Sequence, residues 1–132
     1  MLHVEDNLSN LKLIQRLLVH RPEIRLLPAM QARLGLDLAR EHRPHLILLD
    51  LHLPDMPGEE FLLRLRAIPE TREIPVVVIS ADATPGQITR LLASGARAYL
   101  TKPLDVKKFL ALLDEALQER SQVMQEEALE KG

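Results

Sequence analysis

The chain has 132 residues, the usual length of one domain, and 46% of them are hydrophobic, which is enough for one packed core. Only 2% are aromatic, so that core must be built from Leu, Ile, Val and Ala. A net charge of −2 argues against a strong field for nucleic acid or anionic lipid, and the absence of cysteine excludes disulfides and thiolate metal sites.

Short apolar strands and amphipathic helices alternate through the first third of the chain. Residues 1–4 predict a strand and residues 7–20 a helix, in which Leu and Ile recur at helical spacing. Residues 24–27 predict a second strand, and the prolines on both sides of it favour an edge position. Residues 30–41 predict a helix. The residues expected to face the core from this helix are Met30, Leu34 and Leu38.

The same alternation continues with stronger signals. Residues 45–50 and 74–80 are continuous apolar runs, typical of strands buried on both faces of a parallel sheet. The helix predicted between them, residues 58–67, follows a Pro- and Gly-containing loop. Residues 84–94 predict a helix with a threonine cap, proline at its first position and glycine after its end. Residues 96–100 predict the last strand.

Five strands that alternate with five helices predict an α/β fold, in which an open parallel sheet has helices on both faces. The final helix is expected to begin at Asp105. We expect one domain over residues 1–119, and a helical extension or flexible tail over the polar, Glu-rich residues 120–132. In such folds, ligands bind beyond the carboxyl ends of the strands.

Polar side chains stand at those strand ends: Glu5, Asp6, Asp50, Ser80 and Lys102. A lone acid after a buried strand is often only a cap for the next loop, but three converging carboxylates would repel unless a cation neutralised them. Oxygen donors with room for water suit Mg²⁺. The expected ligands are Glu5, Asp6 and Asp50. Asp50 would be the nucleophile for a phosphoryl group, with the Lys102 ammonium and the Ser80 hydroxyl on the phosphoryl oxygens.

Four sequence blocks contain these residues: Val4–Asn7, Leu48–Gly58, Val78–Ala81 and Tyr99–Pro103. In order and spacing they resemble the signature blocks of response-regulator receiver domains of two-component systems. The resemblance implies a flavodoxin-like (βα)5 fold, doubly wound, with strand order 2-1-3-4-5. It also implies that the backbone carbonyl of His52 completes the metal site, that Ser80 and Tyr99 form a conformational switch, and that the Lys102–Pro103 bond is cis.

By the same resemblance, a histidine kinase or a histidine phosphotransfer protein would phosphorylate Asp50, and homodimers would use the face of the fourth helix, fifth strand and fifth helix. The chain would not be an enzyme beyond self-phosphotransfer and autodephosphorylation. It looks most like the C-terminal receivers of hybrid histidine kinases, although a free-standing regulator is left open. With no visible signal peptide or membrane-length apolar run, we expect a cytoplasmic protein without nucleic-acid or membrane partners.

Two alternatives remain open. A pseudo-receiver would bind proteins without being phosphorylated, but it would be expected to lack one of the four site groups. A phosphatase of the haloacid dehalogenase type would need a second Asp where this chain has His52. The resemblance to receiver domains also implies that His52 and Asp82, each two residues beyond a site residue, could tune the lifetime of the phosphoryl group. The remaining histidines are interpreted as surface or strand-edge residues: His3, His20, His42 and His45.

Overall fold

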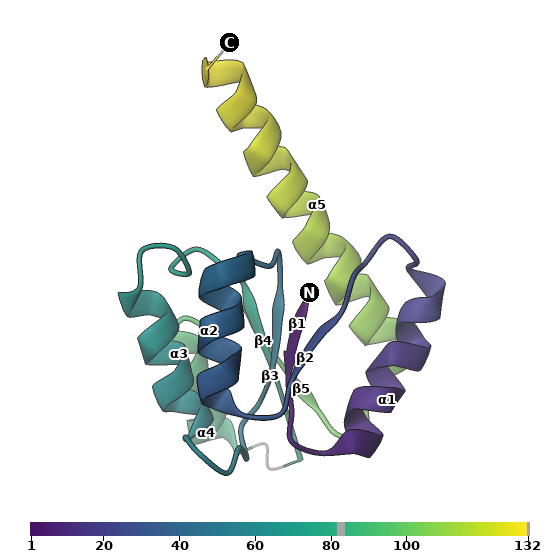
Figure 1. Cartoon of the computed structure of the whole chain (residues 1–132). Helices are drawn as coiled ribbons and strands as arrows, with labels where there is room; N and C mark the ends of the chain where they lie inside the picture. The colour runs from purple at the N-terminus through teal and green to yellow at the C-terminus, as the bar shows by residue number, and fades with distance from the viewer. Residues whose placement is uncertain (82–83, 132) are drawn as a thin grey trace.

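The computed structural model describes residues 1–81 and 84–131, with side chains described as far as Gln118 (Figure 1). The strands are β1 (Leu2–Val4), β2 (Leu27–Ala29), β3 (Ile47–Asp50), β4 (Val76–Ser80) and β5 (Ala98–Thr101). The helices are α1 (Leu8–Leu17), α2 (Ala32–His42), α3 (Gly58–Ala67), α4 (Pro85–Ala93) and α5 (Val106–Lys131), with a short 3₁₀ helix η1 (Leu18–His20) after α1.

The five strands form one parallel sheet in the order β2-β1-β3-β4-β5, which confirms the predicted flavodoxin-like fold. The register pairs Val4 with Leu49, Asp50 with Ile79, and Ser80 with Thr101. The carboxyl ends of the four strands β1, β3, β4 and β5 therefore meet at one edge of the sheet.

Helices cover both faces of this sheet (Figure 1). One core layer packs α2, α3 and α4 against the sheet, with Phe61 and Leu91 among its buried residues. The other layer packs α1 and α5 against the opposite face, with Ile14 and Phe109 buried. Every residue of β3 and β4 is buried, as their continuous apolar runs predict.

The predicted position of β2 is wrong, although its edge location is right. The strand covers Leu27–Ala29 rather than residues 24–27, so Pro28 lies inside it, paired with His3. The bonds to β1 bypass the proline, because Leu27 N donates to Met1 O at 2.8 Å and Glu5 N donates to Ala29 O at 2.8 Å. Since a proline has no N–H to donate, only an edge strand accommodates it without losing a ladder bond.

The predicted inner face of α2 is also wrong in part. Met30 precedes the helix and is 45% exposed, and Leu34 is 45% exposed, while Leu38 is half-buried against the core. A Cβ atom on Gly35 would lie 2.8 Å from Val4 Cγ2, so the helix approaches the sheet too closely for a larger residue. The residues that α2 buries are the small ones, Ala32, Gly35 and Ala39.

The ends of α4 agree with the prediction. The Thr84 side chain accepts a hydrogen bond from Gln87 N at 3.2 Å, and Gly95 follows the helix with a φ of +105°. Helix α5 is continuous to Lys131, and in Figure 1 its second half extends beyond the domain. The division of the chain after residue 119 stays a prediction. Within the described residues, no helix combines the length and apolarity needed to cross a membrane.

Candidate functional site

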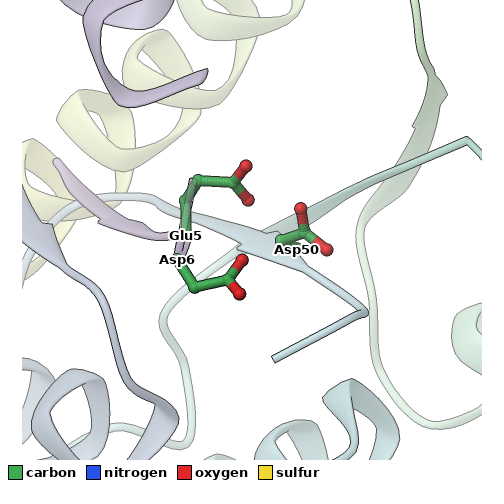
Figure 2. Close-up of side chains that lie close together, drawn as sticks. All are labelled: Glu5, Asp6 and Asp50. Atoms are coloured by element: carbon green, nitrogen blue, oxygen red, sulfur yellow. The ribbon is translucent and has the colours of Figure 1, made fainter. Parts of the chain in front are cut away.

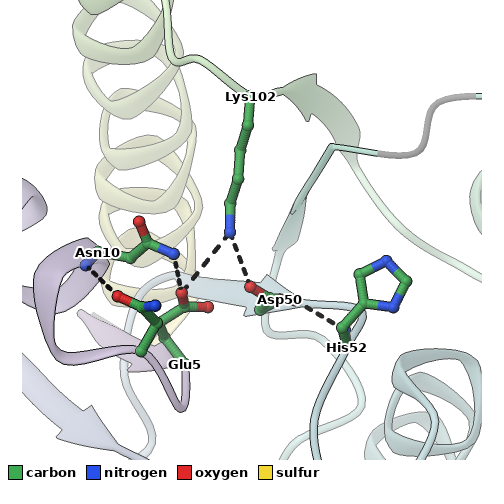
Figure 3. A network of polar contacts seen from close by, with 6 residues as sticks. Glu5, Asn10, Asp50, His52 and Lys102 are labelled. Atoms are coloured by element: carbon green, nitrogen blue, oxygen red, sulfur yellow. Dashed lines mark hydrogen bonds and ion pairs between the residues drawn. The ribbon is translucent and has the colours of Figure 1, made fainter.

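Three charged side chains from different strands meet at the carboxyl edge of the sheet. Asp50 ends β3, Glu5 follows β1, and Lys102 follows β5. Lys102 Nζ lies 2.9 Å from Asp50 Oδ2 and 3.6 Å from Glu5 Oε1, so one ammonium bridges the two buried carboxyls (Figure 3). Glu5 is 1% exposed and Asp50 5% exposed, which strengthens these interactions because little water screens them.

Asp6 completes a cluster of three acids (Figure 2). Glu5, Asp6 and Asp50 each offer a carboxylate oxygen, and these oxygens all lie within 4.8 Å of one another. Asp6 is exposed, so solvent reaches the cluster on its side. The sequence prediction that these three carboxyl groups converge is therefore met by the geometry.

The cluster holds a proton at neutral pH when no cation is bound. Burial raises the pKa of Glu5 to about 8, and its hydrogen bond with Asp50 adds to the effect. Burial alone would also raise the pKa of Asp50. However, hydrogen bonds from Glu5, from the His52 N–H and from Lys102 hold it below its ordinary value. The two pKa values are thus shifted in opposite directions, and Asp50 is the carboxyl that ionises more readily, which suits a nucleophile.

These donors fit a magnesium ion. All three are hard carboxylate oxygens, and Mg²⁺ prefers a few carboxylates with water in its remaining positions. A divalent ion would also replace the proton that Glu5 must otherwise keep, because it neutralises the crowded negative charge. The donor set thus matches the expected cofactor from the chemistry of its residues.

The loop after Asp50 is fixed at both ends. His52 N donates to Asp50 Oδ1 at 2.7 Å (Figure 3). His52 also forms an isolated bridge with Pro57. Asp55 accepts hydrogen bonds from the N–H groups of Ala32 (2.8 Å) and Arg33 (3.0 Å), at the first turn of α2. This role of Asp55 is not predictable from the sequence, because nothing local connects the residue with a helix 23 residues earlier.

The residues of the expected switch lie on β4 and β5. Ser80 is fully buried at the end of β4, and its carbonyl accepts a hydrogen bond from Lys102 N at 3.1 Å. Tyr99 is half-buried and packs against the core layer of α2, α3 and α4. The Lys102–Pro103 peptide bond is cis, in agreement with the expectation. Asp82, the second position expected to tune lifetime, lies outside the described residues.

Two further polar residues, Asn10 and His3, lie at the site, and the sequence did not predict their positions there. The Asn10 side chain donates to the Glu5 carboxylate, which extends the polar network into α1 (Figure 3). His3 was expected at the surface or a strand edge, but it is 3% exposed because β1 has neighbours on both sides and helices on both faces. Its Nδ1 has no hydrogen-bond partner among the described residues, and burial lowers its pKa to about 4. A cavity of about 270 Å³ lies beside it, with Lys102 also in the wall.

Comparisons with known proteins agree on one family. The family model described as response regulator receiver domain matches residues 1–114. The polar-differentiation response regulator DivK of Brucella anthropi is 40% identical over 107 residues, which cover 81% of this chain and 86% of DivK. The DivK of Brucella ovis is 40% identical over 110 residues, with the same coverage of both chains.

Solved structures show the same likeness. A CheY-like receiver protein from Methanospirillum hungatei has a TM-score of 0.82 at 26% identity, over 92% of this chain and 94% of that one. The receiver domain of the sensor histidine kinase PA1611 from Pseudomonas aeruginosa has a TM-score of 0.79 at 26% identity, over 89% of this chain and 95% of that one. That structure holds a magnesium ion coordinated in its active-site cleft.

Proposed function

The chain belongs to the response regulator receiver family, and we propose that Asp50 is the residue through which it performs the family's phosphoacceptor role in two-component signalling. One observation supports this assignment above the others. Asp50 Oδ2 lies 2.9 Å from the Lys102 ammonium, inside a cluster that also contains Glu5 and Asp6. The Asp50 carboxylate is thus surrounded by groups of the kind that phosphoryl transfer needs.

The chemistry follows from these positions. An oxygen of the Asp50 carboxylate attacks phosphorus, a new O–P bond forms, and the bond from phosphorus to the donor's leaving atom breaks. Mg²⁺ bound by Glu5, Asp6, Asp50 and the carbonyl of His52 would neutralise charge on the phosphoryl oxygens. The Lys102 ammonium and the Ser80 hydroxyl would stabilise the same oxygens from the other side. Hydrolysis of the acyl phosphate would return the domain to its resting state.

The partners and output of this domain are finer points of the same proposal. The phosphoryl donor would be a histidine kinase or a histidine phosphotransfer protein, in the cytoplasm. The response would pass from Ser80 to Tyr99 and alter the face of α4, β5 and α5, where a homodimer could form. The mechanism would be the same for a free-standing regulator and for the receiver of a hybrid kinase.

Intact-mass analysis tests the phosphoacceptor assignment. The parent chain, incubated with acetyl phosphate and Mg²⁺, should gain one phosphoryl group, and Asp50→Asn should gain none. Asp37→Asn is a matched control, because Asp37 is an exposed aspartate on α2. An undiminished adduct in Asp50→Asn would refute the assignment. A parent chain that neither gains an adduct nor retains beryllofluoride would instead support the pseudo-receiver alternative.

Amide chemical shifts test the proposed switch separately. Addition of beryllofluoride and Mg²⁺ should shift amides of α4 and β5 as well as those around Asp6 and Asp50. If the changes stayed within the loops at Asp6 and Asp50, the domain would store or relay the phosphoryl group without a conformational output through Tyr99.

A further inference from the structure

A second cavity, of about 740 Å³, lies at the opposite edge of the sheet, at the amino ends of the strands. Its walls come from the segment before β2, from the loop between α2 and β3, and from α5. In Figure 1 this is the edge beyond which α5 extends. Asp50 ends β3 at the opposite, carboxyl edge. The phosphoacceptor chemistry uses none of the residues that line the cavity.

The floor of this cavity is apolar and its rim is basic. Leu46 and Leu113 are buried residues of the floor, and Ile24 and Leu117 add half-buried apolar surface. The exposed rim residues with cationic or ionisable nitrogen groups are Arg25, His42, Arg43 and His45, and Glu23 is the acidic residue among the lining. In the described part of the chain, the side chains of Arg25, Arg43 and His45 form no hydrogen bond or ion pair.

The backbone of Arg43 gives an independent reason to look for a ligand. Arg43 caps the C-terminus of α2 with φ 45° and ψ 61°, and its N–H donates to Ala39 O at 2.9 Å. It is the one non-glycine residue with a positive φ in the described residues. Glycine normally takes this position because it has no Cβ to clash. Strained residues of this kind concentrate at functional sites, so Arg43 is a candidate ligand-binding residue.

We propose that this cavity binds a small organic anion, a molecule with a phosphate or carboxylate group on an apolar body. Arginine guanidinium groups bind both kinds of anion through paired N–H donors, and two of them stand at the rim. The apolar body would lie on the floor formed by Leu46 and Leu113. The volume is within the range of pockets that hold ligands of drug size. Leu46 directly precedes β3, so a ligand there would contact the residue that leads into the strand ending in Asp50.

Titration of the full chain with three probes tests the proposal. Hexyl phosphate has both features, inorganic phosphate has only the anion, and hexanol has only the apolar body. The titrations are made in EDTA, so that no metal recruits phosphate to Asp50. Hexyl phosphate should bind at least about tenfold more tightly than either other probe, and amides of residues 43–46 and of α5 near Leu113 should shift.

Arg43→Gly separates binding from folding, because glycine suits the positive φ and should leave the fold at least as stable. It should weaken hexyl phosphate binding about tenfold or more. Arg40→Ala, an equal loss of charge in the last turn of the same helix, should leave binding unchanged. The proposal is overturned if hexyl phosphate binds no better than inorganic phosphate, if Arg43→Gly binds as tightly as the parent, or if the shifts centre on Asp50 instead.

Discussion

Replacement of His3 by leucine should stabilise the fold, and the gain should grow as the pH falls. His3 is 3% exposed on β1, and its Nδ1 has no partner among the described residues. A buried polar atom without a hydrogen bond costs about 1–3 kcal/mol. Leucine removes that atom, and the neighbouring cavity of about 270 Å³ gives the new side chain room.

The pH dependence follows from the pKa of the same side chain. Burial lowers the pKa of His3 from 6.5 to about 4. Between these two pH values the imidazole is protonated in the unfolded chain but neutral in the folded chain. Stability is therefore lost as the pH falls from 6.5 towards 4, by about 1.4 kcal/mol for each pH unit. At pH 5 the parent should have lost about 2 kcal/mol through His3, a loss that the variant escapes.

Urea denaturation in EDTA at about pH 8 and pH 5, followed by circular dichroism, measures this difference. The raised pKa of Glu5 changes stability in the opposite direction across this range, but Glu5 is present in both proteins, and subtraction removes most of its effect. The difference in unfolding free energy between His3→Leu and the parent should widen by about 2 kcal/mol at the lower pH. His20→Leu, the same substitution at an exposed position, should show no such widening.

A difference that stayed constant between the two pH values would refute the reasoning, since it would mean that His3 is protonated in the folded protein. If His3→Leu were less stable than the parent at pH 8, the imidazole would have to form an interaction that offsets the cost of burying it.

Three further outcomes are expected from the structure. Because burial raises the pKa of Glu5 to about 8, Mg²⁺ must displace the Glu5 proton when it binds at lower pH. The affinity for Mg²⁺, measured by calorimetry, should therefore rise about tenfold from pH 6 to pH 7 and level off above pH 8. An affinity that did not change with pH would contradict this. Gly35→Ala places a Cβ 2.8 Å from Val4 Cγ2, so urea denaturation should show a loss of up to about 2 kcal/mol despite the better helix propensity of alanine. Arg66→Met removes hydrogen bonds of 2.8 Å to three backbone carbonyls and should lower the unfolding free energy by about 1–3 kcal/mol, whereas Arg64→Met, exposed on the same helix, should cost much less.

The sequence was sufficient to predict the order of the elements and the residues gathered at the carboxyl edge. Both follow from local signals, since β3 and β4 are continuous apolar runs and a parallel sheet brings strand ends together. The acids Glu5 and Asp50 and the base Lys102 could therefore be placed in one site before their distances were known.

What could not be predicted depends on contacts between distant segments. The register of β2 is set by its pairing with β1, and its own composition does not reveal that Pro28 belongs to the strand. Hydrophobicity favours Leu34 as an inner residue of α2, but the close approach at Gly35 decides the face. His3 is buried only because its strand is central, which is a property of the topology and not of its neighbours in sequence.

The link between Asp55 and the first turn of α2 restricts which parts of this domain could be exchanged with a relative. Asp50 accepts a hydrogen bond from His52 in the loop, and Asp55 in the same loop accepts hydrogen bonds from α2. The number of residues between the two aspartates must therefore allow both sets of hydrogen bonds to form. An insertion or deletion within residues 51–54 would separate one attachment from the other. In a chimera, α2 and the loop of residues 50–58 should be transferred together. If only one of them were exchanged, the N–H groups in the first turn of the helix could lose the carboxylate that accepts their hydrogen bonds.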